Sequence, residues 1–236
     1  MSSRHSQHSE AASRSRASRD AQRGQWERAL TQRRDRFGID PSGPARVAAD
    51  LFHREGATHL LELGAGQGRD TLFFAGQGFD VTALDYADAA LTAIDEKATA
   101  AGLSARVHTS RFDARQPLPF ADESFHACFS HMLYCMAFTE HELAALTAQV
   151  SRVLRPRGLN VYTARTTRDP DFAKGEHRGE QLYELDGFIV HFFDRDLVTR
   201  VADRLEIIGI DEFEEGPLPR RLYRVTLRKG NSREND

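Results

Sequence analysis

The sequence predicts a doubly wound α/β fold, in which a mostly parallel sheet carries helices on both faces. Between residues 58 and 163, short apolar stretches alternate with amphipathic helical stretches. Such alternation is typical of parallel sheets, because each pair of parallel strands needs a crossover helix between them. The later apolar stretches 206–213 and 221–227 are separated only by a short turn rich in proline, so we expect the C-terminal strand to pair antiparallel.

The N-terminal part divides into a tail and a helical cover. Residues 1–24 contain no valine, leucine, isoleucine or aromatic residue but hold seven serines and five arginines. Such a composition buries too little apolar surface to offset the entropy of ordering, so we expect a disordered tail. The domain is then expected over 25–236, and its first part, 25–55, is expected to form cover helices at 26–37 and 44–55.

The remaining elements follow from apolar spacing and helix-end residues. Thr139 and Glu142 have the capping-box spacing that starts a helix. The polar residues 165–193 interrupt the alternation and are expected to form an insertion over one end of the sheet, as a substrate lid. Seven strands are expected, at 58–63, 81–84, 105–109, 125–130, 159–163, 206–213 and 221–227. Helices are expected to begin near Thr71, Ala89, Thr139 and Asp194.

Composition and charge exclude several classes of protein. The 236 residues carry 32 Lys and Arg against 35 Asp and Glu, so no basic excess points to a nucleic-acid partner. No apolar stretch approaches the ~20 residues of a membrane-spanning helix, and we expect no membrane partner. Two cysteines are too few for a disulfide framework, and the first residues lack an apolar signal-peptide core, so we expect a cytoplasmic protein. The oligomeric state stays open.

A glycine-rich stretch, Glu62 to Gly68, joins the first strand to the following helix. Glycine allows a tight turn and lets a ligand approach the backbone. The spacing is Gly-x-Gly-x-Gly, whereas a dinucleotide-binding loop would carry glycine or alanine where this chain has Arg69. Asp85 ends the next strand, 21 residues after Gly64, where a carboxylate can accept both hydroxyls of a ribose. The alternative is a strand-end aspartate that caps the next helix.

Three blocks of the sequence resemble class I S-adenosylmethionine-dependent methyltransferases, in particular the small-molecule, methyltransferase type 11-like branch. They are 62–68, 81–85 and 113–125; in the third, Asp-Ala is followed by Leu-Pro-Phe and then by Asp-Glu-Ser-Phe. The resemblance covers about residues 56–165 and implies a Rossmann-like fold. The stretch 66–71 is also loosely similar to the tellurite-resistance and thiopurine methyltransferase group.

The resemblance implies S-adenosylmethionine as the cofactor and no metal. The sequence departs from the family pattern in two turns, with His126 where aspartate is common and Arg157 where glycine is common. By resemblance, the methionine part is held by Glu62, Gly64, Ala65, Gly66 and Gly68, the ribose by Asp85, the adenine by Tyr86, Asp113 and Ala114, and the sulfonium end by Ser130 and His131.

Methyl transfer requires alignment of the two reactants and, for a protonated acceptor, removal of a proton. His131 is the first candidate for the base, because it follows the fourth strand; the alternative is that it only hydrogen-bonds backbone or cofactor. Tyr134 and His191 complete the set of catalytic candidates. The insertion begins with Arg165 and holds further basic residues, which favours a small anionic acceptor.

Two other functions remain open. One is a nicotinamide-dependent oxidoreductase, and the other is a non-catalytic cofactor-binding module that regulates a partner. Arg69 and the Leu-Pro-Phe block at 118–120 count against the first. The polar insertion favours a substrate pocket over the second. The sequence does not name the acceptor or its accepting atom, whether oxygen, nitrogen, sulfur or another chalcogen.

Overall fold

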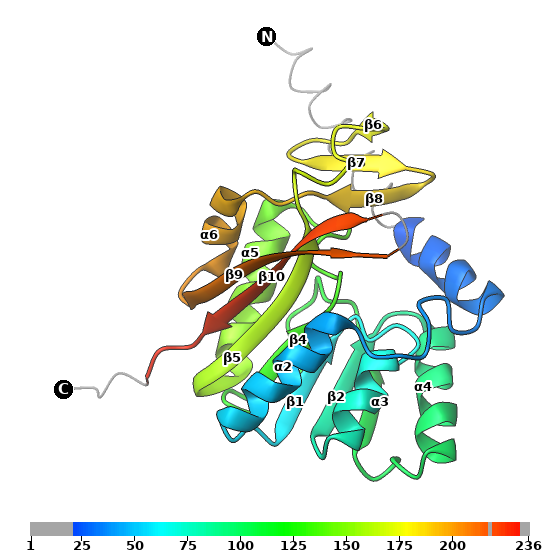
Figure 1. The fold of residues 1–236 in the computed structure, drawn as a ribbon, viewed down its shortest axis with the longest axis vertical. Helices are drawn as coiled ribbons and strands as arrows, with labels where there is room; N and C mark the ends of the chain where they lie inside the picture. The colour runs from blue at the N-terminus through cyan, green and yellow to red at the C-terminus, as the bar shows by residue number, and fades with distance from the viewer. Residues whose placement is uncertain (1–20, 217–218, 232–236) are drawn as a thin grey trace.

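The computed structural model describes residues 21–216 and 219–231 (Figure 1). Its main sheet has seven strands in the order β3-β2-β1-β4-β5-β10-β9, which confirms the predicted Rossmann-like α/β fold. The strands are β1 His59–Leu63, β2 Asp80–Asp85, β3 Val107–Arg111, β4 Phe125–Ser130, β5 Leu154–Arg165, β9 Glu206–Glu215 and β10 Arg220–Arg228.

The strand directions place an opening at the centre of the sheet. Strands β1 to β5 pair in parallel, and β10 runs antiparallel to both β5 and β9. The chain moves from β1 outward to β3 and then returns to place β4 on the other side of β1. In such sheets, ligands bind beyond the C-terminal strand ends at the point where the order reverses.

Helices cover both faces of the main sheet. They are α2 Gly43–Arg54, α3 Arg69–Gly76, α4 Asp88–Ala100, α5 Glu140–Val153 and α6 Arg195–Ala202. Successive residues of a strand point to opposite faces. Leu61 and Leu63 accordingly join the apolar cluster under α5 and α6, while Leu60 joins the one under α2, α3 and α4.

Helix ends follow the capping residues of the sequence. The Thr139 side chain accepts the Glu142 N–H, and the Glu142 carboxylate accepts the Thr139 N–H, which confirms the capping box of α5. Asp194 caps α6 by accepting the Leu197 N–H at 2.7 Å. Caps of this kind stabilise a helix by about 1 kcal/mol each.

The N-terminal helix starts earlier than the sequence predicts. It runs over residues 21–32, and 33–37 form turns instead of its last part. The expected disorder of 1–20 lies outside the described residues, but the predicted tail boundary at 24 is wrong. Gln22 explains why: its buried side chain donates to Gly187 O at 2.9 Å and accepts the Ile189 N–H at 3.1 Å. These contacts with a distant segment favour a helix that the local composition does not.

The insertion contains a small antiparallel sheet of its own, in the order β6-β7-β8, beyond the C-terminal ends of the parallel strands (Figure 1). Its strands are β6 Glu176–His177, β7 Leu182–Leu185 and β8 Phe188–His191. Leu182, Ile189 and Phe192 are buried. The insertion is therefore a packed element, although its sequence is largely polar.

Candidate functional site

The candidate site lies along the C-terminal ends of four neighbouring strands. The glycine loop 64–68 follows β1, Asp85 ends β2, Asp113 follows β3 and His131 follows β4. Because the sheet order is β3-β2-β1-β4, these groups lie in sequence along one edge. The Phe112 N–H donates to the Asp85 carbonyl oxygen at 2.9 Å, which joins the backbone just before Asp113 to the end of β2.

The glycines of the loop have two different roles. Gly64, Gly66 and Gly68 all have positive φ, at 70°, 54° and 84°. A Cβ at Gly68 would lie 2.6 Å from Ile94 Cγ1, so this glycine permits close packing of the loop on α4. A Cβ at Gly66 would meet no atom of the described residues within 4 Å. The space beside the Gly66 Cα is therefore open, as the predicted cofactor contact requires.

Asp85 is fixed beside this loop. Its Oδ2 accepts the Gly66 N–H at 2.9 Å, and its Oδ1 accepts the Ala87 N–H at 2.9 Å. Burial raises the pKa of Asp85 above its ordinary value, although the N–H groups of Ala87 and Gly66 act in the opposite direction. Each oxygen retains a lone pair for another donor. The carboxylate thus supports the start of α4, and its predicted contact with a ribose stays a prediction that is compatible with this role.

Glu62 is the second acid of the loop region, and it is buried. Its Oε2 accepts the Thr71 hydroxyl at 2.6 Å. Burial raises the pKa of Glu62 well above its ordinary value, and the negative charge of Asp70 adds to this effect. A cationic group placed beside this carboxyl would oppose both effects and favour its ionised form.

The residues after β2 and β3 form a less open part of the edge. Asp113 pairs with Arg115 through Nε–Oδ1 and Nη2–Oδ2 contacts of 3.1 and 2.8 Å. Burial acts to raise the pKa of Asp113, but the hydrogen bonds and charge of Arg115 outweigh it and hold the pKa below its ordinary value. Tyr86 packs against Leu30 of the N-terminal helix. Contacts of Tyr86, Asp113 and Ala114 with an adenine stay predictions.

The last residue of β4, Ser130, has a buried hydroxyl without a hydrogen-bond partner among the described residues. The next residue, His131, has both ring nitrogens in contact with other groups. His131 lies between two groups: Nδ1 is 2.9 Å from Thr163 Oγ1, and Nε2 is 3.1 Å from Glu215 Oε2. The Thr163 oxygen also accepts the Met132 N–H at 2.9 Å, so its own hydroxyl hydrogen is free to point at His131 Nδ1.

Glu215 is a site residue that the sequence did not predict. It ends β9, and its Oε1 lies 3.6 Å from Arg69 Nη2 at the start of α3. Burial acts to raise the pKa of Glu215, but the hydrogen bond and charge of His131 and the charge of Arg69 outweigh it and lower the pKa. The end of β9 therefore lies beside the residue that follows β4.

Comparison with known families identifies the central part of the chain. Residues 60–158 match the family model described as "Methyltransferase domain". This segment is therefore similar to a methyltransferase domain. The match spans β1 to the start of β5 and contains the glycine loop, Asp85, Asp113 and His131. No curated protein sequence matches the chain.

Solved structures share the fold at low sequence identity. A SAM-dependent methyltransferase of Methanosarcina mazei aligns with a TM-score of 0.63 and 20% identity over 74% of this chain and 93% of that one. The CcbJ methyltransferase of Streptomyces caelestis aligns with a TM-score of 0.64 and 18% identity over 80% and 91%. The TehB protein of Haemophilus influenzae aligns with a TM-score of 0.62 and 16% identity over 80% and 62%. At these identities the likeness shows the fold.

Tyr134 does not reach the edge where the methyltransferase domain presents its loop. It is fully buried, and its hydroxyl contacts Thr147 Oγ1 at 3.4 Å and Asn160 Nδ2 at 3.3 Å. Its ring stacks on Tyr162 with centroids 4.0 Å apart. Burial raises the pKa of Tyr134. The structure thus makes Tyr134 a core residue, and the catalytic role predicted for it is not carried forward.

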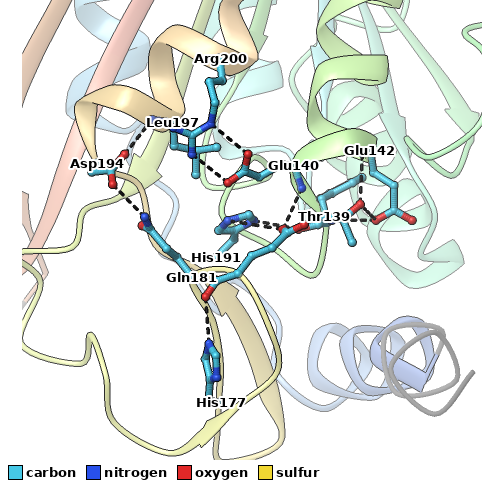
Figure 2. Close-up of polar contacts among 11 residues, drawn as sticks. Thr139, Glu140, Glu142, His177, Gln181, His191, Asp194, Leu197 and Arg200 are labelled. Carbon is cyan, nitrogen blue, oxygen red and sulfur yellow. Dashed lines mark hydrogen bonds and ion pairs between the residues drawn. The ribbon is translucent and has the colours of Figure 1, made fainter. Parts of the chain in front are cut away.

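His191 is also buried, at 0% exposure, in the polar cluster that Figure 2 shows between the insertion, α5 and α6. Its Nδ1 donates to Phe138 O at 2.8 Å, and its Nε2 lies 4.0 Å from Glu180 Oε2. The Glu180 carboxylate in turn accepts the N–H of Glu140, the first residue of α5. Burial lowers the pKa of His191. Because the imidazole has no surface open to a ligand, its predicted catalytic role is replaced by a structural one.

The arginines of the insertion form ion pairs with acids nearby. Arg165 is 6% exposed, pairs with Asp169 and lies 2.6 Å from Asp171. Arg168 pairs with Glu212 in the same way. The prediction that the insertion is a cationic cover over an anionic acceptor is therefore corrected, because these arginines are already paired with acids of the described residues.

The two cysteines and the surface hollows add no second site. Burial raises the pKa of the Cys135 thiol to about 11 and that of the Cys128 thiol further. Surface hollows of about 210 and 300 Å³ are lined around Arg155 and around Arg221, and neither includes the loop 64–68. Among the described residues, no cluster of three metal-binding side chains occurs. In the same part of the chain, no helix has the length and apolar character needed to cross a membrane.

Proposed function

We propose that this chain is an S-adenosylmethionine-dependent methyltransferase that methylates a small-molecule acceptor. The observation that carries the proposal is the contact between Asp85 and the Gly66 N–H inside the segment that matches the methyltransferase family. This contact places a carboxylate that accepts hydrogen bonds beside an open glycine backbone, at the sheet position where such folds bind ligands. A related fold, that of a Burkholderia thailandensis methyltransferase, was solved with 1,6-didemethyltoxoflavin and S-adenosylhomocysteine, which supports a small acceptor.

The residues present fit this cofactor. Gly66 has open space at its Cα, and Asp85 has free lone pairs for ribose hydroxyls. Glu62 would hold the cationic amino group, and the unpartnered Ser130 hydroxyl would face the sulfonium end. When bound, S-adenosylmethionine supplies a methyl group on an activated leaving group. The loop then serves to bind and orient it.

The chain's own residues would align the acceptor and handle its proton. His131 stays the candidate base, with one qualification from the geometry. Both ring nitrogens are engaged, Nδ1 by Thr163 Oγ1 at 2.9 Å and Nε2 by Glu215 Oε2 at 3.1 Å, so one of these contacts would have to open before His131 could take a proton from an acceptor. The N-terminal helix and the insertion would exclude water from the acceptor side.

A titration with three ligands tests the proposal. Calorimetry on the purified chain compares S-adenosylmethionine, S-adenosylhomocysteine and NAD. We expect the first two ligands to bind and NAD not to bind. A dinucleotide-binding loop would carry glycine or alanine at the position where this chain has Arg69. Binding of NAD alone would overturn the assignment.

A methyl-acceptor screen separates an enzyme from a regulatory module. Labelled S-adenosylmethionine is incubated with thiols, phenols, amines and carboxylates, and product is detected by mass spectrometry. Transfer to one class identifies the accepting atom. Tight cofactor binding with no transfer to any class, at enzyme concentrations above that of cofactor, would favour the non-catalytic alternative.

A further inference from the structure

Gln67, the second variable position of the glycine loop, directs its side chain away from the site edge. The residue is 7% exposed. Its Nε2 donates to Leu30 O and to Arg33 O, each at 2.9 Å, and its Oε1 accepts the Arg36 N–H at 2.8 Å. Both amide hydrogens and the amide oxygen are thus bound to the end of the N-terminal helix and to the turns 33–37 that follow it.

Two cations strengthen the same junction. Lys97 Nζ donates to the Gln67 carbonyl oxygen at 2.9 Å and to Asp35 Oδ1 at 2.5 Å. Arg69 Nη1 donates to Phe37 O at 2.8 Å. The loop and the turns 33–37 therefore share hydrogen bonds through both the side chain and the backbone of Gln67.

The other side of the N-terminal helix is bound to the insertion. The Trp26 ring lies 4.7 Å from the Phe188 ring, measured between centroids. A Cβ at Gly187 would lie 2.6 Å from Gln25 Nε2, so the Gln25 side chain lies against the backbone of this turn. Together with the Gln22 hydrogen bonds, these contacts make the helix a bridge between the glycine loop and the lid.

We propose that Gln67 is a positioning residue that couples occupation of the glycine loop to the seating of the N-terminal helix and, through it, of the insertion. The inference rests on the proposed function, because it assigns the cofactor to this loop. A ligand that favours one conformation of the loop also favours the Gln67 orientation that holds 33–37, and coupling of this kind is reciprocal. The N-terminal helix and the insertion therefore cover the acceptor side most stably when cofactor is already bound.

The chain carries its own reporter for this coupling. Trp26 is the only tryptophan, so its emission reports the seating of the N-terminal helix on Phe188. We expect S-adenosylhomocysteine to shift that emission and to slow hydrogen exchange over residues 21–37. In Gln67→Ala, the same ligand should leave both quantities unchanged, and its Kd should rise about fivefold or more. A merely structural role would raise exchange in this variant but keep the response to ligand.

A matched control and a second variant keep the test decisive. Gln77→Ala changes an exposed glutamine at the other end of α3 and should respond to ligand as the unmodified chain does. Gln67→Glu retains the acceptor for Arg36 N–H but sets an oxygen against the carbonyls of Leu30 and Arg33, so it should uncouple even if Gln67→Ala is poorly folded. If ligand binds and the Trp26 response persists in both Gln67 variants, the inference is wrong. If no ligand binds to the unmodified chain, the proposed function fails first and the inference with it.

Discussion

Asp85 and Glu215 show which single residues a sequence can reveal. Asp85 lies at a fixed spacing from the loop glycines, and the Gly66 N–H gives that spacing its physical basis. Glu215 lies far along the chain from His131, and nothing in its local sequence distinguishes it from Glu214. Its role depends on where the β9–β10 pair lies in the sheet, beside β5, which no local pattern fixes. The catalytic role predicted for Tyr134 is not supported, for the opposite reason. Tyr134 is close in sequence to residues of the site, but its side chain is buried in the core.

The first residue-scale prediction concerns Asp85→Ala. Loss of charge-assisted hydrogen bonds worth ~1.5–3 kcal/mol should weaken S-adenosylhomocysteine binding roughly 10- to 150-fold in calorimetry. Asp88→Ala is the control, because Asp88 is exposed and pairs only at the surface with Arg111. Equal affinities in the two variants would remove Asp85 from the cofactor site.

Tyr134→Phe should affect stability and not chemistry. The hydroxyl contacts with Thr147 and Asn160 are long, so we expect unfolding in urea to become easier by about 1 kcal/mol. Tyr162→Phe is a matched control, because the Tyr162 hydroxyl is buried without a partner among the described residues and its removal should cost nothing. A tenfold loss of methyl transfer in Tyr134→Phe, with the fold intact, would restore its catalytic role.

At the scale of elements, the parallel strands and their helices were predictable and the additions to them were not. Local periodicity located β1 to β5, and capping residues located α5 and α6. The insertion was expected only as a polar lid over one end of the sheet, and its own strands were not predicted, because they are short and their apolar residues are scattered. Its fold depends on partners distant in sequence, such as Gln22 and the helix that carries it. The same long-range contacts explain why that helix starts earlier than the sequence predicts.

The buried His191 predicts a pH dependence for the docking of the insertion. Burial lowers its pKa below the ordinary value of 6.5, although the Phe138 carbonyl and the charge of Glu180 oppose this. As pH falls below 6.5, the unfolded chain takes up a proton that the folded chain does not, so folded stability decreases until the lowered pKa is passed. Above that range His191 is neutral in both the folded and the unfolded chain, so it adds no pH dependence to the free energy of unfolding.

The measurement is the free energy of unfolding in urea at a series of pH values. His191→Gln should flatten the acid side of the curve relative to the unmodified chain. The charges that face His191, on Glu180, Glu140 and Arg200, are present in both proteins. An unchanged slope in His191→Gln would contradict the structural role given to it.

At the scale of the whole molecule, alternation of strands and helices fixed the architecture, and the family match and structural neighbours agree with it. The site edge follows from that architecture, since the ends of adjacent parallel strands meet there. The covering elements do not follow from it, because they come from the two ends of the domain and from the insertion. Their relation to the glycine loop emerges only from contacts such as those of Gln67.

The position of β10 has a consequence for synthesis. This strand is made last among the described elements, yet it lies inside the sheet, between β5 and β9. A growing chain therefore keeps the long edge of β5 unpaired until residue 228 is available, and unpaired edges promote association between chains. A chain ended after Gly216 should accumulate in the insoluble fraction on expression, whereas one ended after Gly230 should stay soluble. Because β10 is synthesised after β5, we expect the solubility of the growing chain to depend on completion of this last strand.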